Sequence, residues 1–84
     1  MPSPEEIRAR IEHGLPGARA EVVDTTGGGD HFDVRVRAAA FGGKSLVEQH
    51  QLVYGALGGL MAQIHALSLR TEGLQEKNDD LRSS

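Results

Sequence analysis

The sequence predicts an α+β domain in which helices pack on one face of a three-stranded sheet. Helical and alternating apolar patterns follow one another in the order helix, strand, strand, helix, helix, strand. A glycine-rich loop separates the first two strands, which is typical of a hairpin, and a helical segment returns the chain to the third. A crossover of this kind favours a third strand parallel to one hairpin partner. With 84 residues, the chain is long enough for one modest core.

The first element is a helix expected over residues 3–13. Residues 3–6, SPEE, have the pattern of a capping box with proline at the first helical position. Ile7 and Ile11 lie one turn apart and are expected to face the core, and the glycines and proline that follow end the helix. His13, in the last turn, is expected to be a solvated residue that interacts with the helix dipole.

Two strands joined as a hairpin are expected next. Residues 18–24 alternate weakly, whereas residues 32–37 alternate cleanly between apolar and charged side chains. The apolar members of the second run are expected to face the core: Phe32, Val34 and Val36. The loop over residues 24–30 contains three consecutive glycines, which permit backbone conformations closed to other residues. We therefore expect a β-hairpin with a flexible loop.

The segment Gly42-Gly43-Lys44-Ser45 has two interpretations, a phosphate-binding loop or a helix start. A Walker A loop needs glycine at the position that Ala38 occupies here, so the nucleotide-binding interpretation fails at its most demanding residue. Ser45 followed by Glu48 instead predicts a capping box. The segment is best interpreted as the entrance to a helix.

The second half of the chain predicts two helices and a strand. The first helix is indicated by a stripe of residues at helical spacing: Leu46, His50, Val53 and Leu57. Val47 and Tyr54 broaden this stripe. Gly55 is expected to interrupt this helix, and a second short helix is expected over residues 57–64. Residues 65–71 alternate again and predict the third strand. Residues 72–84 are polar and predict a flexible tail, so the folded domain is expected to cover residues 1–71.

The composition excludes several classes of protein. The chain has no cysteine, which rules out disulfides, thiolate metal sites and a cysteine nucleophile within it and fits a reducing cytoplasm. No apolar run approaches the roughly 20 residues of a membrane span, so we expect a soluble cytoplasmic protein. Residues 1–71 hold seven Lys or Arg and eight Asp or Glu, a balance that lowers the expectation of nucleic-acid binding.

Histidine is the residue type in this chain that is best suited to bind a metal. No enzyme signature is present, because the serines and carboxylates are accounted for by helix caps, strand surfaces and the tail. His50, on an apolar stripe, is interpreted as half-buried with a hydrogen-bond partner. His31 and His65 begin the second and third strands, so the two imidazoles emerge at one end of the sheet if these strands are neighbours. Such a pair suits iron, zinc or copper, and two unconnected surface residues are the alternative.

Three stretches of the sequence resemble a known protein family. FGGKSLVEQHQLVYGAL followed by IHALSLRT resembles the signature of the BolA family, and GGGDHFDV resembles the family's loop and second strand. The similarity covers about residues 4–71. It implies an α-β-β-α-α-β fold with type II KH-like topology. It also implies a partner, a monothiol glutaredoxin of the CGFS type, with which BolA-like proteins share a bridging [2Fe–2S] cluster.

The resemblance also implies ligands for the cluster. The family's ligand near the start of the last strand matches His65, and the second ligand, from the loop between the first two strands, corresponds to His31. The short loop without cysteine resembles the short-loop branch. Two departures stand out: the family's Arg-His-Arg reads Gln49-His50-Gln51, which reduces phosphate-contact capacity, and the tryptophan often found after the last strand is absent.

A chain without cysteine needs outside thiolates to hold a [2Fe–2S] cluster, because such a cluster takes four ligands. A glutaredoxin cysteine and glutathione supply two, and two imidazoles complete an asymmetric site. Ligation requires neutral imidazole, so assembly is expected to weaken below a pH of about 6.5.

Two other functions compete with cluster binding. A nucleic-acid-binding transcriptional regulator would use residues 42–44 with Arg35, Arg37 and Arg70, although FGGKS lacks the GXXG spacing of KH domains. A plain interaction module whose apolar groove accepts a helix would bind its partner without iron. Weak nucleic-acid binding and a homodimer are left open by the sequence.

Overall fold

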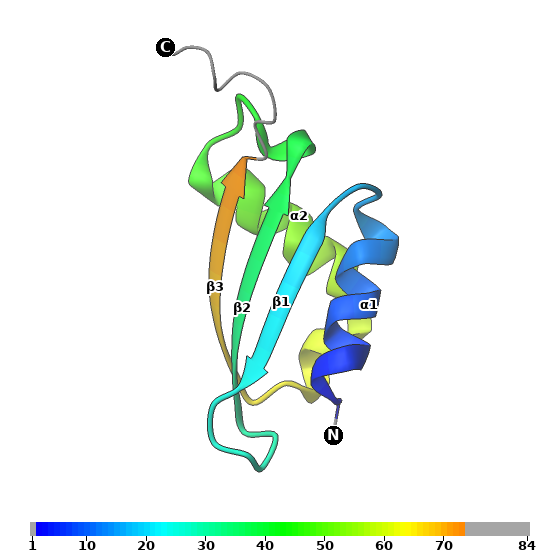
Figure 1. The fold of residues 1–84 in the computed structure, drawn as a ribbon, viewed down its shortest axis with the longest axis vertical. Coiled ribbons are helices and arrows are strands. Elements are labelled where there is room, and N and C mark those ends of the chain that lie inside the picture. The colour runs from blue at the N-terminus through cyan, green and yellow to red at the C-terminus, as the bar shows by residue number, and fades with distance from the viewer. Residues whose placement is uncertain (1, 74–84) are drawn as a thin grey trace.

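The computed structural model describes residues 2–73, and the rest of the expected polar tail lies outside the described residues. Figure 1 shows two layers, a sheet in front and helices behind. In chain order the elements are α1 (Pro4–Gly14), β1 (Arg19–Asp24), β2 (His31–Ala38), the 3₁₀ helix η1 (Ala39–Phe41), α2 (Leu46–Leu57), the 3₁₀ helix η2 (Gly58–Gln63) and β3 (Ala66–Gly73). The predicted α+β class and element order are confirmed.

The sheet has the order β1-β2-β3, with β2 in the centre. β1 pairs antiparallel with β2, and β3 pairs parallel with β2, as the crossover predicted. α1 and α2 cover one face of this sheet, and the other face is open (Figure 1). No helix of the described chain is long and apolar enough to span a bilayer.

One hydrophobic core lies between the sheet and the helices. The alternation of β2 is confirmed, because its apolar side chains are at most 2% exposed whereas its charged side chains face water. Both isoleucines of α1 are fully buried, as predicted. The full set of buried apolar residues is Ile7, Ile11, Ala18, Ala20, Phe32, Val34, Val36, Ala38, Phe41, Val53, Leu57, Leu60 and Ile64.

α1 begins and ends for local reasons that the sequence shows only in part. The hydroxyl of Ser3 accepts a hydrogen bond from the Glu6 amide at 3.1 Å, but the reciprocal bond, from the Ser3 amide to the Glu6 carboxylate, is not formed, so the expected capping box is half complete. Gly14, the last residue of α1, has a second role. A Cβ on it would lie 2.7 Å from Cβ of Ala56, so α1 and α2 are in close contact here.

α2 starts as predicted and continues further than expected. The Ser45 hydroxyl accepts from the Glu48 amide at 3.1 Å, and the Glu48 carboxylate accepts from the Ser45 amide at 2.9 Å. The prediction that Gly55 interrupts the helix is wrong. One glycine costs a helix about 1 kcal/mol, which the burial of Val53 and Leu57 on either side offsets. The expected second helix is the 3₁₀ helix η2, entered at Gly58 with φ 55°.

The predicted apolar stripe of α2 is too wide. Leu46 and Val47 are 61% and 66% exposed, and Tyr54 is also exposed. The buried side chains of α2, Val53 and Leu57, lie in its C-terminal half, where the helix meets α1. Spacing alone places an apolar residue on a face but does not show which neighbours cover that turn.

β3 extends beyond the expected strand. It runs to Gly73, two residues past the expected domain boundary at 71. The Thr71 hydroxyl donates to Oε1 of Gln49 at 2.6 Å, and Nε2 of Gln49 donates to the carbonyl of Lys44 at 3.0 Å. Gln49, at a position where the family resemblance expects arginine, therefore joins α2 to the end of β3.

Candidate metal-binding site

His31 is the first residue of β2, and its main chain is fixed on the loop side. The carbonyl of His31 accepts hydrogen bonds from the Thr25 amide at 3.0 Å and from the Thr25 hydroxyl at 3.2 Å. This pair of contacts closes the hairpin at its base. The imidazole is therefore carried by main chain that two hydrogen bonds hold in place.

The glycine loop that precedes His31 is organised around one carboxylate. Oδ1 of Asp24 accepts from the amide and the hydroxyl of Thr26 and from the Gly27 amide, and Oδ2 accepts from the Gly29 amide. Gly27 and Gly29 have φ near +80°, a conformation that glycine adopts without steric cost. The expected hairpin is confirmed, and its loop, expected to be merely flexible, is held by four hydrogen bonds in this structure.

His65 comes to the same end of the sheet through the parallel pairing of β2 and β3. His31 is the register partner of Ala66, the residue directly after His65. Strand spacing and rise put the Cα atoms of the two histidines about 6 Å apart. Figure 1 shows the β1–β2 loop and the start of β3 at one end of the molecule. The two strands are neighbours, which was the condition for the histidines to share one end of the sheet, and the His65 side chain is exposed.

The side chain of His31 lies over the open face of the sheet. Its Nε2 is 3.0 Å from the hydroxyl of Ser68 and 3.7 Å from Oδ1 of Asp33. The side chain is 39% exposed, so one part of the ring is held by the sheet and another faces solvent. His31, Asp33 and Ser68 come from two neighbouring strands that the crossover brings together.

His31 and His65 are the candidate metal ligands at this end of the sheet. Within residues 2–73, no group of three or more His, Cys, Asp or Glu side chains is placed to hold an ion. His31 and His65 offer two imidazole nitrogens, and the chain has no cysteine to add. Two neutral nitrogen ligands suit a metal or cluster whose other ligands come from a second molecule.

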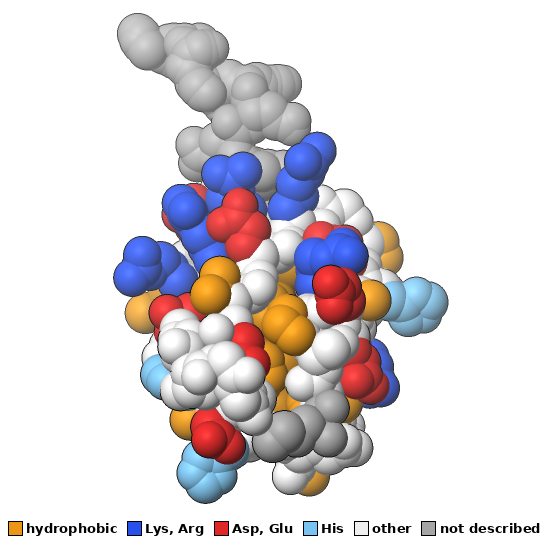
Figure 2. Space-filling view, turned by 60° about the horizontal axis from the view of Figure 1, so that its bottom comes forward, with side chains coloured by type: hydrophobic (Ala, Val, Ile, Leu, Met, Phe, Trp, Pro, Cys, Tyr) orange, Lys and Arg blue, Asp and Glu red, His pale blue; other side chains and the backbone are white. Residues whose placement is uncertain are grey.

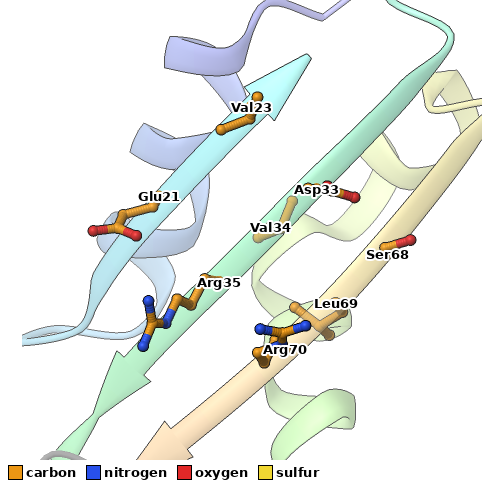
Figure 3. A pocket seen from close by; sticks show the side chains of 8 residues that line it. All are labelled: Glu21, Val23, Asp33, Val34, Arg35, Ser68, Leu69 and Arg70. Atoms are coloured by element: carbon orange, nitrogen blue, oxygen red, sulfur yellow. The ribbon is translucent and has the colours of Figure 1, made fainter. Parts of the chain in front are cut away.

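The rest of the open face carries charges of both signs. A shallow cavity of about 360 Å³ lies over the strands (Figure 3), lined by Glu21, Val23, Asp33, Val34, Arg35, Ser68, Leu69 and Arg70. Arg35 is 2.9 Å from the Glu72 carboxylate, and this hydrogen bond, with the nearby charges of Glu72 and Glu21, raises the pKa of the Arg35 guanidinium. Figure 2 shows basic and acidic side chains interleaved rather than a continuous basic patch.

Comparison with known proteins identifies the family of the chain. Residues 9–76 match the family model of BolA-like proteins. This chain belongs to the BolA family. It is 39% identical over 71 residues to Protein BOLA2 of Arabidopsis thaliana, covering 83% of this chain and 76% of that protein. It is 35% identical over 71 residues to BolA-like protein 2 of Homo sapiens, covering 82% and 83%.

Solved structures of the BolA family support the same fold. A bolA protein homologue from Coxiella burnetii superposes with a TM-score of 0.68 at 40% identity, over 84% of this chain and 90% of that one. BolA1 from Arabidopsis thaliana gives a TM-score of 0.74 at 26% identity, over 87% and 93%. The predicted α+β fold of the BolA type is therefore confirmed.

His50 and His13, the remaining histidines of this BolA domain, lie away from the pair. His50 is half-buried, as predicted, but its Nε2 is buried without a hydrogen-bond partner among the described residues, contrary to expectation. Its ring meets Tyr54 edge-on, with centroids 6.2 Å apart. His50 lies in the helical layer, whereas His31 lies on the open face. His13 is exposed in the last turn of α1, as predicted.

Sequence spacing does not identify four residues of the site. Asp24 and Thr25 fix the loop and the His31 carbonyl, and Asp33 and Ser68 flank the His31 ring. Alternation predicts that Asp33 and Ser68 point outward. Only the register between β2 and β3 shows that they share one face beside His31.

Proposed function

We propose that this chain is a non-enzymatic cytoplasmic partner of a monothiol CGFS glutaredoxin, with which it co-ligates a bridging [2Fe–2S] cluster in iron–sulfur trafficking or iron regulation. The observation that supports this proposal most directly is the parallel pairing of β2 with β3. It puts His31 beside the residue that follows His65. Two imidazoles far apart in sequence thus share one end of the sheet.

The ligands of the proposed cluster come from this chain and from the glutaredoxin with its glutathione. In this proposal His31 and His65 each provide a neutral ring nitrogen, and the glutaredoxin cysteine and glutathione provide the thiolates that a cysteine-free chain lacks. Histidine ligation makes the cluster electronically asymmetric and raises its reduction potential relative to an all-thiolate site. The cluster is cargo held between the partners.

The exposure of the two histidines suits a shared site. His65 is exposed, and His31 keeps 39% of its side chain in contact with solvent. A second protein can therefore reach both rings without unfolding the domain. The Asp24-centred loop and the Thr25 contacts hold His31 in place before a partner arrives, which lowers the ordering cost of association.

The direct experiment is reconstitution of the mixed complex. The full chain is combined anaerobically with a CGFS glutaredoxin, glutathione, ferrous iron and sulfide, and the visible spectrum is compared with that of the glutaredoxin homodimer. A distinct spectrum is expected, and His65→Ala should abolish the difference. His13→Ala removes a histidine at the last turn of α1 and should leave the spectrum unchanged.

Nitrogen coupling in magnetic spectra of the reduced complex, made with ¹⁵N-histidine in this chain, would identify the ligands. All-sulfur coordination of both irons would refute the proposal. Complex formation without iron in the isolated material would indicate a plain interaction module instead. Binding to single-stranded nucleic acid that falls steeply with salt would favour the regulator, although the interleaved charges of the open face give that function no particular support.

A further inference from the structure

We propose that Ser68 and Asp33 are positioning residues that keep the proton of the His31 ring on Nε2 and leave Nδ1 free as the metal ligand. This inference rests on the proposed function, since it specifies which atom of His31 would face the cluster. It follows from the contacts of one ring nitrogen. Nε2 is engaged by the sheet, so it is not the atom offered to a partner.

The proton position follows from the two groups beside Nε2. A serine hydroxyl both donates and accepts, so the 3.0 Å contact with Ser68 is compatible with either tautomer. An ionised carboxylate only accepts, and Oδ1 of Asp33 lies 3.7 Å from the same nitrogen. Its negative charge favours a proton on Nε2 and opposes a lone pair there. Together the two groups favour the Nε2–H tautomer.

A neutral imidazole with its proton on Nε2 has its lone pair on Nδ1. The tautomer of a metal-binding histidine is set in this way by the hydrogen bond of its other nitrogen, and loss of such an outer partner commonly weakens metal binding 10- to 100-fold. Here the His31 main chain is also fixed, because its carbonyl accepts two bonds from Thr25. Ring and backbone are thus both oriented before any metal arrives.

The contacts form only in the complete sheet. Asp33 follows His31 on the same face of β2, and its register partner on β3 is Ser68. Ser68 is exposed and takes part in no other side-chain hydrogen bond among residues 2–73. Its hydroxyl contributes nothing to the core, so its removal is expected to leave the fold intact.

The tautomer is measurable in the free chain, without a cluster. With ¹⁵N-histidine labelling at pH about 8, where imidazole is ordinarily neutral, long-range ¹H–¹⁵N correlations should show His31 protonated on Nε2. Ser68→Ala and Asp33→Asn should each shift His31 toward a tautomer mixture, and Ser68→Thr should restore the original pattern. A proton on Nδ1 in the unmodified chain would overturn the proposal.

Reconstitution with the glutaredoxin, glutathione, iron and sulfide provides the second readout. Ser68→Ala should reduce cluster loading about tenfold, Ser68→Thr should restore it, and Arg70→Gln, on the same face of β3, should leave it unchanged. Equal loading of Ser68→Ala and the unmodified chain would refute the positioning role. If the unmodified chain binds no cluster but shows the Nε2–H tautomer, the proposed function fails while the tautomer assignment stands.

Discussion

Oδ2 of Asp24 accepts a hydrogen bond from the Gly29 amide across 2.9 Å, and this contact ties the far side of the glycine loop to the last residue of β1. The other carboxylate oxygen holds the near side through Thr26 and Gly27. The Asp24 side chain therefore holds both sides of the loop that leads into His31.

Asp24→Asn should loosen this loop. Asparagine has one acceptor oxygen, so it cannot serve both sides of the turn, and a hydrogen bond to a charged group is worth about 1.5–3 kcal/mol. We expect amide hydrogen exchange at Gly27 or Gly29 to accelerate at least about tenfold, measured by NMR, and cluster loading to fall. Asp30→Asn removes the same charge from the same loop and should change neither. Unchanged exchange in Asp24→Asn would show that the loop holds its shape without the carboxylate.

Two glycine-to-alanine variants should have opposite effects on stability. At Gly14 the new methyl group would lie 2.7 Å from Cβ of Ala56, and such overpacking costs about 1–3 kcal/mol. At Gly55 the new Cβ would meet no atom within 4 Å beyond its chain neighbours and the backbone of α2 itself, among residues 2–73, so alanine should stabilise α2 by about 0.5–1 kcal/mol. Urea unfolding curves measure both. Equal stabilisation by the two substitutions would contradict the close helix contact.

Two leucine-to-alanine variants at opposite ends of α2 test the burial pattern. Leu57 is fully buried, so Leu57→Ala should lower the free energy of unfolding by about 2–5 kcal/mol. Leu46 is 61% exposed, and Leu46→Ala should change it by at most about 0.5 kcal/mol. The same denaturation experiment gives both values. A large loss at Leu46 would mean that the first turn of α2 is covered in solution, for example by a second copy of the chain.

The capping box at the start of α2 should contribute measurably. Ser45→Ala removes the hydroxyl that accepts from the Glu48 amide, and the loss of such a cap costs about 1 kcal/mol. Ser45→Asp keeps an acceptor at the cap and should retain most of the stability. Thermal unfolding followed by circular dichroism measures the difference. If the Ser45→Ala and Ser45→Asp variants unfolded at the same temperature, the hydrogen bond at this cap would make no net contribution to stability.

Local patterns predicted the parts of this fold that depend on a few neighbouring residues. The cap at Ser45 and Glu48 requires only their spacing, and the burial of Phe32 and Val34 follows from strict alternation. The parallel third strand followed from the helical crossover that leads to it. These features are fixed by interactions within one element or by the geometry of chain connections.

The failures arise where a second element decides the outcome. Val47 and Tyr54 lie at helical spacing but are exposed, because no element among residues 2–73 covers them. Gly55 does not break α2, because packing on either side exceeds the cost of one glycine. At the site, the sequence indicated that His31 and His65 share an end of the sheet if their strands are neighbours. It gave no indication that Ser68 faces the His31 ring, because that contact depends on the exact register of two strands far apart in the chain.

Because β3 pairs with β2, the two histidines come to one end of the sheet only when the whole sheet has formed. The β1–β2 hairpin closes a short loop, whereas α2 and η2 lie between β2 and β3 in the chain, so the β2–β3 pairing closes a much larger loop. Such long-range pairings are slow steps, since the entropy of a large loop must be lost first. In a nascent or partly unfolded chain, His31 and His65 are therefore not yet brought to the same end of the sheet. Under the proposed function, a chain that has not completed its sheet would therefore bind the cluster less well than the folded domain.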